Sequence, residues 1–342
     1  MANNDSKTKA FATTAKSKAK RKNKNSKKRL RQQVVISIFA VIALILLVFA
    51  TLIIGKIFTT QKNTNPSTEP GYNMITVPRE EAAVHMGNLL LINNNFKCNK
   101  IDSSDFVNLY NYRADKNNSE VTQINGKSTY GLVDASIYLN QTTLDAFNIM
   151  MLDYCNANNL TSSSTSTLSN IEVTLGGFPA NDTSGYNEYL DIGPDYYDHI
   201  TGTTITIKTS SPSSVIKEAS LKEQYNWIYQ NAHKYGFIIR YPDGCAQHTQ
   251  IPANTRLHLR YVGIEHATYI HQNNICLEEY LELIRTKHTF SNPLSIDSAN
   301  GRTYLVYYVE YSGNPTSIPV VKDKNYTISG DNMNGFIVTV EE

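Results

Sequence analysis

The sequence predicts a single-pass membrane protein with an external α+β domain. Three observations lead to this prediction: an uninterrupted apolar stretch near the amino terminus, a central segment with apolar residues at helical spacing, and carboxyl-terminal segments that alternate or run apolar between turn signals. The chain has 342 residues, so the part behind the apolar stretch is long enough for one domain of ordinary size with a small extension.

The amino-terminal segment is strongly basic. Its first 31 residues contain twelve Lys or Arg and one acid, Asp5, whereas the whole chain carries a formal charge of only +2. The head is therefore about +11 and the remainder about −9. A nucleic-acid-binding arm is one interpretation of such a run. The segment that follows favours another: a topology signal that also attracts anionic lipid headgroups, with no nucleic-acid partner.

Residues 34–55 are predicted to form a transmembrane helix. Val34–Ile54 contains no charged residue, and as a helix it would rise about 30 Å, the thickness of the hydrocarbon core of a bilayer. No small-x-small cleavage site follows, which indicates an uncleaved anchor. Because the Lys/Arg excess precedes the helix, residues 1–33 should be cytoplasmic and the main domain extracellular, in the cell membrane.

The external part is predicted to have three segments. Residues 56–76 form a stalk, since Gln61–Tyr72 is polar and contains two prolines. Residues 77–290 form the main domain, in which Leu144–Leu152 has the spacing of a helix packed on a core. Residues 300–342 form a small β extension of three or four short strands, at Thr303–Tyr311, Thr316–Val321 and Gly335–Val340.

Three segments of the main domain, Tyr225–Pro242, Leu257–Gly263 and Cys276–Tyr280, carry a family resemblance. They strongly resemble the core of the VanY-type D-alanyl-D-alanine carboxypeptidases, zinc enzymes that trim peptidoglycan stem peptides. The resemblance covers roughly residues 85–290 and is most specific in the second half. It implies the α+β Hedgehog/D,D-peptidase zinc fold, in which helices flank an antiparallel sheet.

The family's first metal motif reads Ser-x-His-x-x-Gly-x-Ala-x-Asp, with the His and Asp as zinc ligands. Tyr197–Thr206 fits this frame, keeps His199 and Gly202, and has Thr206 at the position of the ligand Asp. The alternation of Thr203–Ile207 supports the alignment, because it is typical of a strand with a buried face. The resemblance thus implies a metal site of His199 and His258, with Thr206 at the third-ligand position.

The family's second motif reads Glu-x-x-His and continues into Arg-Tyr-Val-Gly. Thr255–Gly263 matches it from His258 onward, but Thr255 stands where the family has the Glu that activates the metal-bound water, and Leu257 replaces a Trp. The family also has an Arg that binds the substrate carboxylate. It should fall near Val173–Phe178, which contains no Arg, so the substrate-binding residues are unknown.

These substitutions are unfavourable to catalysis. A threonine hydroxyl is neutral and poorly replaces a carboxylate ligand, so zinc binding is expected to be weak or absent. Loss of a positioned general base typically costs about 10²–10⁴-fold in rate. Asp198 adjoins His199, but neighbouring side chains of a strand face opposite sides, so we expect it to be badly placed as a ligand. The candidates for rescue of the site are Asp191, Asp195 and His248.

Four cysteines, Cys98, Cys155, Cys245 and Cys276, fall on the external side, where two disulfides are chemically allowed. Cys98–Cys155 is the favoured pair, and the connectivity stays open. The spacings match no zinc-finger pattern, and Cys276 is expected to be a small buried residue. His266 and Trp227 are expected to pack in the core rather than bind a ligand.

Three functions are compatible with this sequence. The first is a membrane-anchored, carboxypeptidase-like protein with degenerate catalysis, which acts as a cell-wall binding or regulatory module with peptidoglycan stem peptides as partners. The second is an active zinc D,D-carboxypeptidase with a rearranged site. The third is a structural surface protein that reuses the fold. Metal content distinguishes the first two, and binding to purified peptidoglycan separates both from the third.

Overall fold

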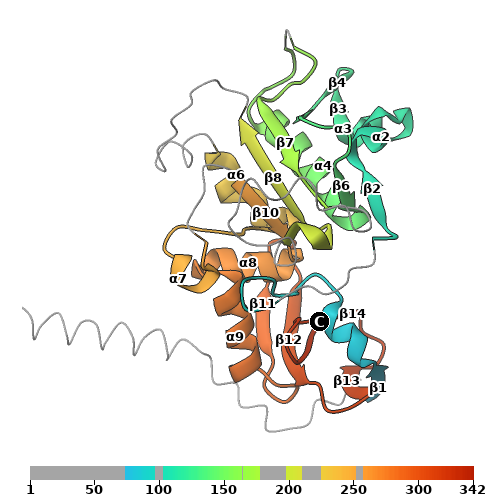
Figure 1. Cartoon of the computed structure of the whole chain (residues 1–342), viewed down its shortest axis with the longest axis vertical. Coiled ribbons are helices and arrows are strands. Elements are labelled where there is room, and N and C mark those ends of the chain that lie inside the picture. Colours follow the sequence, from blue (N-terminus) through green and yellow to red (C-terminus); the bar gives the residue numbers. More distant parts are fainter. Residues whose placement is uncertain (1–73, 97–102, 164, 178–197, 210–224, 252–256) are drawn as a thin grey trace, which may run out of the picture. The chain divides into compact units, whose positions relative to one another are not determined.

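The structure is a computed structural model that describes residues 74–96, 103–163, 165–177, 198–209, 225–251 and 257–342 (Figure 1). The basic head and the Val34–Ile54 segment lie outside these residues. Among the helices that are described, none is both long and apolar enough to cross a membrane. The chain divides into two units at Gly71, and all described residues belong to the second, Tyr72–Glu342.

A five-stranded sheet forms the centre of the main domain (Figure 1). The strands, in spatial order, are β5 (Gly131–Leu132), β7 (Ile171–Leu175), β8 (Thr204–Thr209), β10 (Leu257–Tyr261) and β9 (Phe237–Ile239). All neighbours pair antiparallel except β5 and β7, which pair parallel. The predicted α+β class with a mainly antiparallel sheet is thus observed. β8 is buried along both faces except at Lys208, whereas the sequence predicted one buried face.

Helix α4 (Gln141–Ala157) packs against this sheet and contains the predicted helix Leu144–Leu152. The side chain of its N-cap, Asn140, accepts a hydrogen bond from the Thr143 N–H at 2.8 Å, which satisfies one of the free donors at the helix start. Leu144 and Phe147 bury completely against Ile205 and other strand residues. Trp227 of α6 (Asn226–Asn231) packs on the edge of the same core, as expected.

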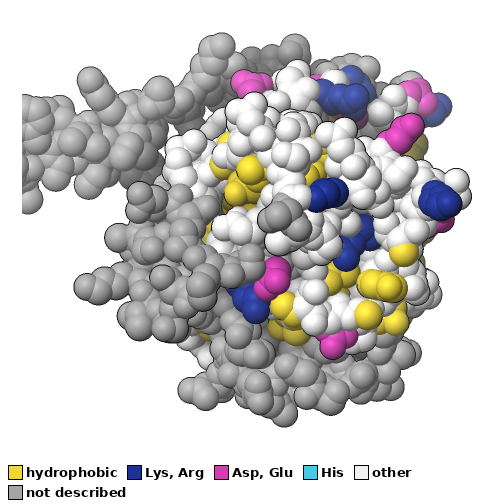
Figure 2. Space-filling view, turned by 90° about the horizontal axis from the view of Figure 1, so that it is seen from above, with side chains coloured by type: hydrophobic (Ala, Val, Ile, Leu, Met, Phe, Trp, Pro, Cys, Tyr) yellow, Lys and Arg dark blue, Asp and Glu magenta, His cyan; other side chains and the backbone are white. Residues whose placement is uncertain are grey.

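Several small elements, at residues 106–140, precede α4 in the chain. They include the β2–β6 pair, the β3–β4 pair and three short helices between them. Their bounds are β2 Phe106–Asn108, α2 Leu109–Ala114, η2 Lys116–Asn118, α3 Ser119–Thr122, β3 Gln123–Ile124, β4 Lys127–Ser128 and β6 Tyr138–Asn140. The face seen in Figure 2 carries acidic and basic side chains interspersed, so its described residues present no large patch of one sign.

A second sheet of four strands follows, in the order β11 (Leu294–Asp297), β12 (Thr303–Glu310), β15 (Gly335–Glu341) and β14 (Tyr326–Gly330). Helices α8 (Ile264–Asn273) and α9 (Leu277–Lys287) share one hydrophobic cluster with this sheet and with Leu89 and Leu91. The predicted strands at 303–311, 316–321 and 335–340 are present, the second as β13 (Thr316–Val321). β14 is the fourth strand, which the sequence left open, and β11, which precedes residue 300, was not predicted.

The carboxyl-terminal sheet is joined to the start of the domain. β1 (Met74–Arg79) pairs antiparallel with β13, from Met74 opposite Val321 to Arg79 opposite Thr316. Its first three residues fall in the segment predicted as stalk, so ordered structure begins earlier than expected. Val84 of η1 (Glu81–His85) packs into the cluster formed by β12, β13 and β15. The extension therefore shares core residues with both ends of the domain.

Candidate metal centre

His199 is positioned by a short 3₁₀ helix and a tight turn. It lies in η4 (Asp198–Thr201), which precedes β8, whereas the alignment placed it on a strand. Gly202 then reverses the chain with φ +66°, and its N–H donates to the His199 carbonyl at 2.9 Å. A Cβ at Gly202 would collide with the ring of Phe106. A glycine is required here because the backbone is left-handed and closely covered.

The pairing of β8 with β10 brings the other two residues together. His258 of β10 lies directly opposite Thr206 of β8, so their side chains share one face of the sheet. The hydroxyl of Thr206 lies 2.8 Å from His199 Nε2 and 3.0 Å from His258 Nδ1. All three residues are at least 95% buried. The structure thus brings His199, Thr206 and His258 into one buried triad.

The hydrogen bonds of the triad restrict its protons. A hydroxyl has one proton, so Thr206 donates to at most one of the two imidazoles and accepts from the other. The pKa of His199 is lowered well below its ordinary value, first because of burial and then because of the positive charges of His258 and Arg260 nearby. His199 is therefore neutral at pH 7. The site offers two imidazole nitrogens and one uncharged oxygen.

A buried ion-pair network lies beside the triad. The Asp198 carboxylate pairs with the Arg240 guanidinium and, at 3.2 Å, with Arg260. Arg240 also makes a two-pronged contact with Glu278, at 3.0 and 2.8 Å. Burial would lower the pKa of Arg240, but Asp198 and Glu278 outweigh it and raise that pKa well above its ordinary value. Two positive charges face two negative charges, so the network is balanced.

This network explains why Asp198 does not serve the triad. Its side chain is fully buried and engaged by two arginines. The sequence predicted the same outcome for a wrong reason, since Asp198 is on a 3₁₀ helix and not on a strand. The two arginines also donate to backbone carbonyls of Asn88, Leu90 and Ile92, which ties the amino-terminal segment to the sheet. Each arginine lies inside an otherwise largely apolar run, Arg240 in Phe237–Tyr241 and Arg260 in Leu257–Val262. This pattern could have indicated a buried ion pair from the sequence.

The other residues that the sequence analysis singled out lie outside the triad or outside the described residues. Thr255, Asp191 and Asp195 lie outside the described residues. His248 lies on α7 (Ala246–Thr249), 3.3 Å from a Glu279 carboxylate oxygen, and does not join the triad. His266 is buried in α8 against Tyr280 and Thr339, as expected. Cys155 is a buried free thiol whose sulfur lies 3.5 Å from the Thr129 carbonyl, so the favoured Cys98–Cys155 pairing was wrong.

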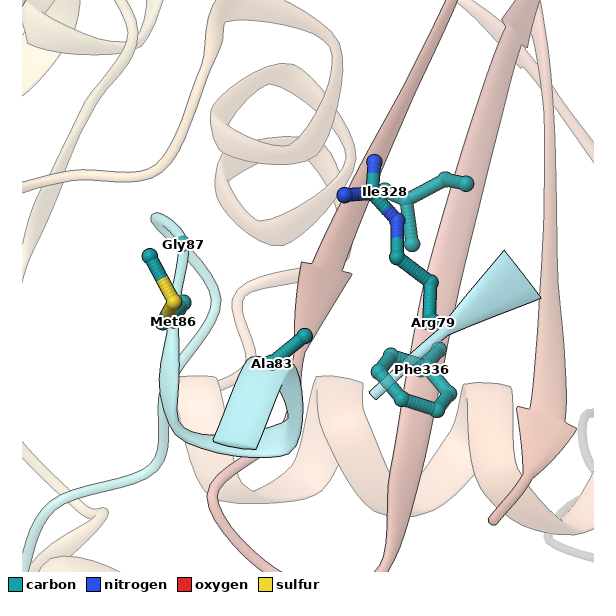
Figure 3. A pocket seen from close by; sticks show the side chains of 6 residues that line it. All are labelled: Arg79, Ala83, Met86, Gly87, Ile328 and Phe336. Atoms are coloured by element: carbon teal, nitrogen blue, oxygen red, sulfur yellow. The ribbon is translucent and has the colours of Figure 1, made fainter. Parts of the chain in front are cut away.

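A cleft of about 260 Å³ lies elsewhere, on the carboxyl-terminal sheet. Figure 3 shows Arg79 passing Phe336 toward Ile328, with Ala83, Met86 and Gly87 on the other side. None of these six residues belongs to the triad or its ion-pair network. The cleft is therefore a feature of the β1–β13 region and not part of the candidate metal centre.

Comparisons with known proteins identify the family of this chain. The VanY family, described as D-alanyl-D-alanine carboxypeptidase, matches residues 138–264, a span that includes the whole triad. A D-alanyl-D-alanine carboxypeptidase of Enterococcus faecium is 30% identical over 290 residues, which cover 81% of this chain and 82% of that protein. A second one, of Enterococcus faecalis, is 48% identical over 59 residues, 17% of this chain and 22% of that protein.

Among solved structures, the vancomycin-resistance D,D-dipeptidase VanXYg, in complex with a D-Ala-D-Ala phosphinate analogue, superimposes with a TM-score of 0.60. The match covers 79% of this chain and all of that chain, at 21% identity, and it supports the fold. The mixed fold and the triad together define a D,D-peptidase-like protein. The chain belongs to the VanY-type D-alanyl-D-alanine carboxypeptidase family.

Proposed function

We propose that this chain is a membrane-anchored, extracellular carboxypeptidase-like protein that binds D-Ala-D-Ala-ending stem peptides of peptidoglycan and has lost efficient catalysis. The observation that carries the proposal is the direct hydrogen bonding of Thr206 to both histidines, at 2.8 and 3.0 Å. In this arrangement Thr206 satisfies one ring nitrogen of each histidine without an ion.

The spacing of the triad supports weak metal binding. Tetrahedral zinc with bonds of about 2.0 Å to nitrogen and oxygen holds its ligands about 3.3 Å apart. The two contacts of Thr206 are shorter than that, so a zinc ion would have to break both hydrogen bonds and spread the three side chains. The residues present therefore fit a tight catalytic zinc poorly.

The charge of the site points the same way. A carboxylate at position 206 would offset one of the two charges of zinc, whereas the threonine hydroxyl offsets none. Asp198 does not supply the missing charge because Arg240 and Arg260 already neutralise it. The sequence also has Thr255 at the position of the family's general base. Both changes reduce peptidase chemistry and leave the fold intact.

Substrate binding is proposed from the family relationship. The relatives are named as D-alanyl-D-alanine carboxypeptidases, and the VanXYg structure holds a D-Ala-D-Ala phosphinate analogue. On this proposal, the chain keeps the fold and still binds the same peptide end, although it hydrolyses poorly. It would then act as a binding or regulatory module of the cell wall.

The decisive experiment measures zinc content and D-alanine release with the full-length protein in detergent. We expect the zinc content after dialysis to be the same in wild type and in the His199→Ala/His258→Ala variant, no D-alanine release from a stem pentapeptide ending in D-Ala-D-Ala, and retention of the wild-type protein on purified peptidoglycan. Binding that ignores the D-Ala-D-Ala end would favour a structural surface protein.

An active zinc peptidase is the second candidate, favoured by the convergence of His199 and His258 on one point. Turnover that depends on zinc and disappears in His258→Ala would establish an active peptidase and overturn the hypothesis that catalysis has been lost. Its matched control is His271→Ala, which removes an exposed histidine of α8 outside the triad.

The membrane anchor and the orientation rest on the sequence alone. The basic head and the uncharged Val34–Ile54 segment support an orientation with the main domain outside the cell. External protease on intact cells should digest the chain beyond about Gln61 and spare the first 31 residues. Digestion of the head with protection of the carboxyl-terminal half would reverse the proposed topology.

A further inference from the structure

A second group of metal-ligating side chains lies outside the triad, where α7 meets the start of α9. Cys245 Sγ, Cys276 Sγ and a Glu279 carboxylate oxygen all lie within 4.8 Å of one another. His248 Nε2 reaches the other oxygen of the same carboxylate at 3.3 Å. We propose that Cys245, Cys276, Glu279 and His248 form a structural zinc site, which goes beyond the proposed function.

The sequence spacing fits such a site. Cys245 and His248 are three residues apart at the start of α7, and Cys276 and Glu279 are three residues apart at the start of α9. Side chains three apart share one face of a helix, so each helix contributes a pair of donors. Two short-spaced pairs from separate segments are the usual layout of structural zinc sites. The pattern escapes a search for cysteine pairs because each pair contains only one cysteine.

The distances fit tetrahedral coordination. Bonds of about 2.3 Å to sulfur and 2.0 Å to oxygen or nitrogen separate zinc ligands by about 3.3–3.8 Å. Cys245 Sγ lies 3.7 Å from Glu279 Oε2, and His248 Nε2 lies 3.3 Å from Glu279 Oε1. The two sulfurs are unbonded to each other. Cys245, Cys276 and Glu279 thus already hold three donors within 4.8 Å of one another, and His248, which lies beside the other Glu279 oxygen, would turn toward them as the fourth ligand.

Local structure alone explains only part of the cluster. The Cys276 N–H donates to Glu279 Oε2 at 3.0 Å, and the Cys276 sulfur accepts from the Glu279 N–H, which together form a capping box. The box accounts for the position of Glu279. It does not account for Cys245 and His248, which meet the same carboxylate from another helix.

The donor chemistry selects zinc. Two thiolates and one carboxylate would give three negative charges against the +2 of the ion, and the two thiol protons would leave to solvent on binding. Soft sulfur donors exclude magnesium and calcium. Cys245 and Cys276 are 7% and 1% exposed, whereas the side chains of His248 and Glu279 are 38% and 34% exposed. The two sulfurs are therefore shielded from water, and a metal ion can enter from the exposed side, where His248 and Glu279 lie.

A metal here would hold an otherwise weak element. α7 has four residues, and an isolated turn of helix is unstable in water. The ion would fasten this turn to α9, whose Glu278 pairs with Arg240, and Arg240 in turn pairs with Asp198 beside the triad. The site would stabilise the segment between β9 and β10 and the network that supports His199.

The test uses full-length protein, purified in reductant, stripped with a chelator and titrated with Co²⁺, which occupies zinc sites and reports sulfur ligands by a charge-transfer band in the near ultraviolet. We expect one equivalent of Co²⁺ with this band. Cys245→Ser and Cys276→Ser should each abolish the band. Glu279→Gln, which keeps an oxygen for the capping box, and His248→Ala should each weaken binding about 10-fold or more.

Two controls separate this site from the others. The His199→Ala/His258→Ala double variant should keep the band, since the triad has no sulfur, and this result is independent of the proposed function. Cys155→Ser removes a buried thiol outside the cluster and should change nothing. The proposal is overturned if wild-type protein shows no sulfur-to-cobalt band, or if each of the single variants Cys245→Ser and Cys276→Ser keeps the band. It is also overturned if protein alkylated at cell lysis contains a Cys245–Cys276 disulfide.

Discussion

The triad of His199, Thr206 and His258 and the cluster of Cys245, His248, Cys276 and Glu279 contrast in position and in charge. The triad consists of the residues that the family motif predicted at a zinc site, is buried, and contains no negatively charged donor. The cluster lies at the junction of two helices, is half open to solvent, and can supply three negative charges. The two proposals together make the charge and softness of the donors, rather than position in the fold, the property that decides which site binds zinc.

The largest expected effect comes from the ion pairs that support the triad. Asp198→Ala should reduce the free energy of unfolding by about 3–5 kcal/mol, because it leaves Arg240 and Arg260 buried with one carboxylate between them. Denaturant unfolding measures the effect. The matched control is Lys208→Ala, which breaks the half-exposed pair with Glu172 and should cost less than about 1 kcal/mol. Equal costs for the two variants would show that the buried network contributes no more to stability than an exposed ion pair.

The second prediction concerns a variant that gives the triad a negatively charged donor, as the cluster has. Thr206→Asp adds one negative charge between the two histidines, and an added charge within about 4 Å of an ion is worth several kcal/mol at an effective dielectric constant of about 20. After the cost of burying the carboxylate, we expect zinc affinity to rise on the order of 10²-fold. Isothermal titration of a variant lacking Cys245 and Cys276 isolates this site. Unchanged affinity in a folded Thr206→Asp protein would mean that the three residues do not form a ligand set.

The third prediction removes the hydroxyl instead. Thr206→Val keeps the shape of the side chain and takes one hydrogen-bond partner from each histidine. Because the position is 1% exposed, water cannot easily replace the hydroxyl, and we expect a loss of about 1–3 kcal/mol. Thermal or denaturant unfolding provides the measurement, with Thr76→Val on an exposed strand position as the control. A stable Thr206→Val protein would indicate that the triad is not held by this hydroxyl.

The sequence predicted the triad better than its surroundings. Residues 199, 206 and 258 could be paired because the family motif fixes their places, and the structure brings their side chains within hydrogen-bond distance. The 3₁₀ helix at Asp198 was missed because the motif implied a strand, and a turn stabilised by Gly202 leaves little periodic signal. The Asp198–Arg240–Glu278 network was missed because its members lie far apart in sequence, and only the packing of α9 on the sheet brings them together.

The cluster of Cys245, His248, Cys276 and Glu279 was also missed because its two halves lie far apart in the sequence. Cys276 was correctly expected to be buried, but its proximity to Cys245 depends on how α7 docks on α9. Local patterns report helices and strands, whereas contacts between elements follow from tertiary packing, which one sequence does not encode in any short motif. The β1–β13 pairing is a further case, because it joins residues 74–79 to residues 316–321, and neither segment predicts the other.

The smallest expected effect concerns a buried histidine that belongs to neither site and so tests how burial alone acts on an imidazole. His266 contacts the Tyr280 hydroxyl at 2.7 Å, the Thr339 hydroxyl at 3.1 Å and the Glu265 carboxylate at 3.5 Å. Burial lowers the pKa of His266, although the Glu265 charge partly opposes this. The unfolded chain takes up the proton near pH 6.5, whereas the folded chain does so only at lower pH.

The unfolded state therefore binds more protons below pH 6.5, and stability should be fully present above pH 6.5 and fall as the pH drops below it. One histidine contributes at most about 1.4 kcal/mol per pH unit. His233, whose pKa is lowered to about 4 by burial first and then by the neighbouring His271 and Lys234, should add to the same slope. Denaturant unfolding of wild type and His266→Gln between pH 7.5 and 5 measures the difference. The variant should lose part of the slope. An identical slope would show that burial of His266 does not disfavour its charged form, and would contradict the same effect of burial at His199.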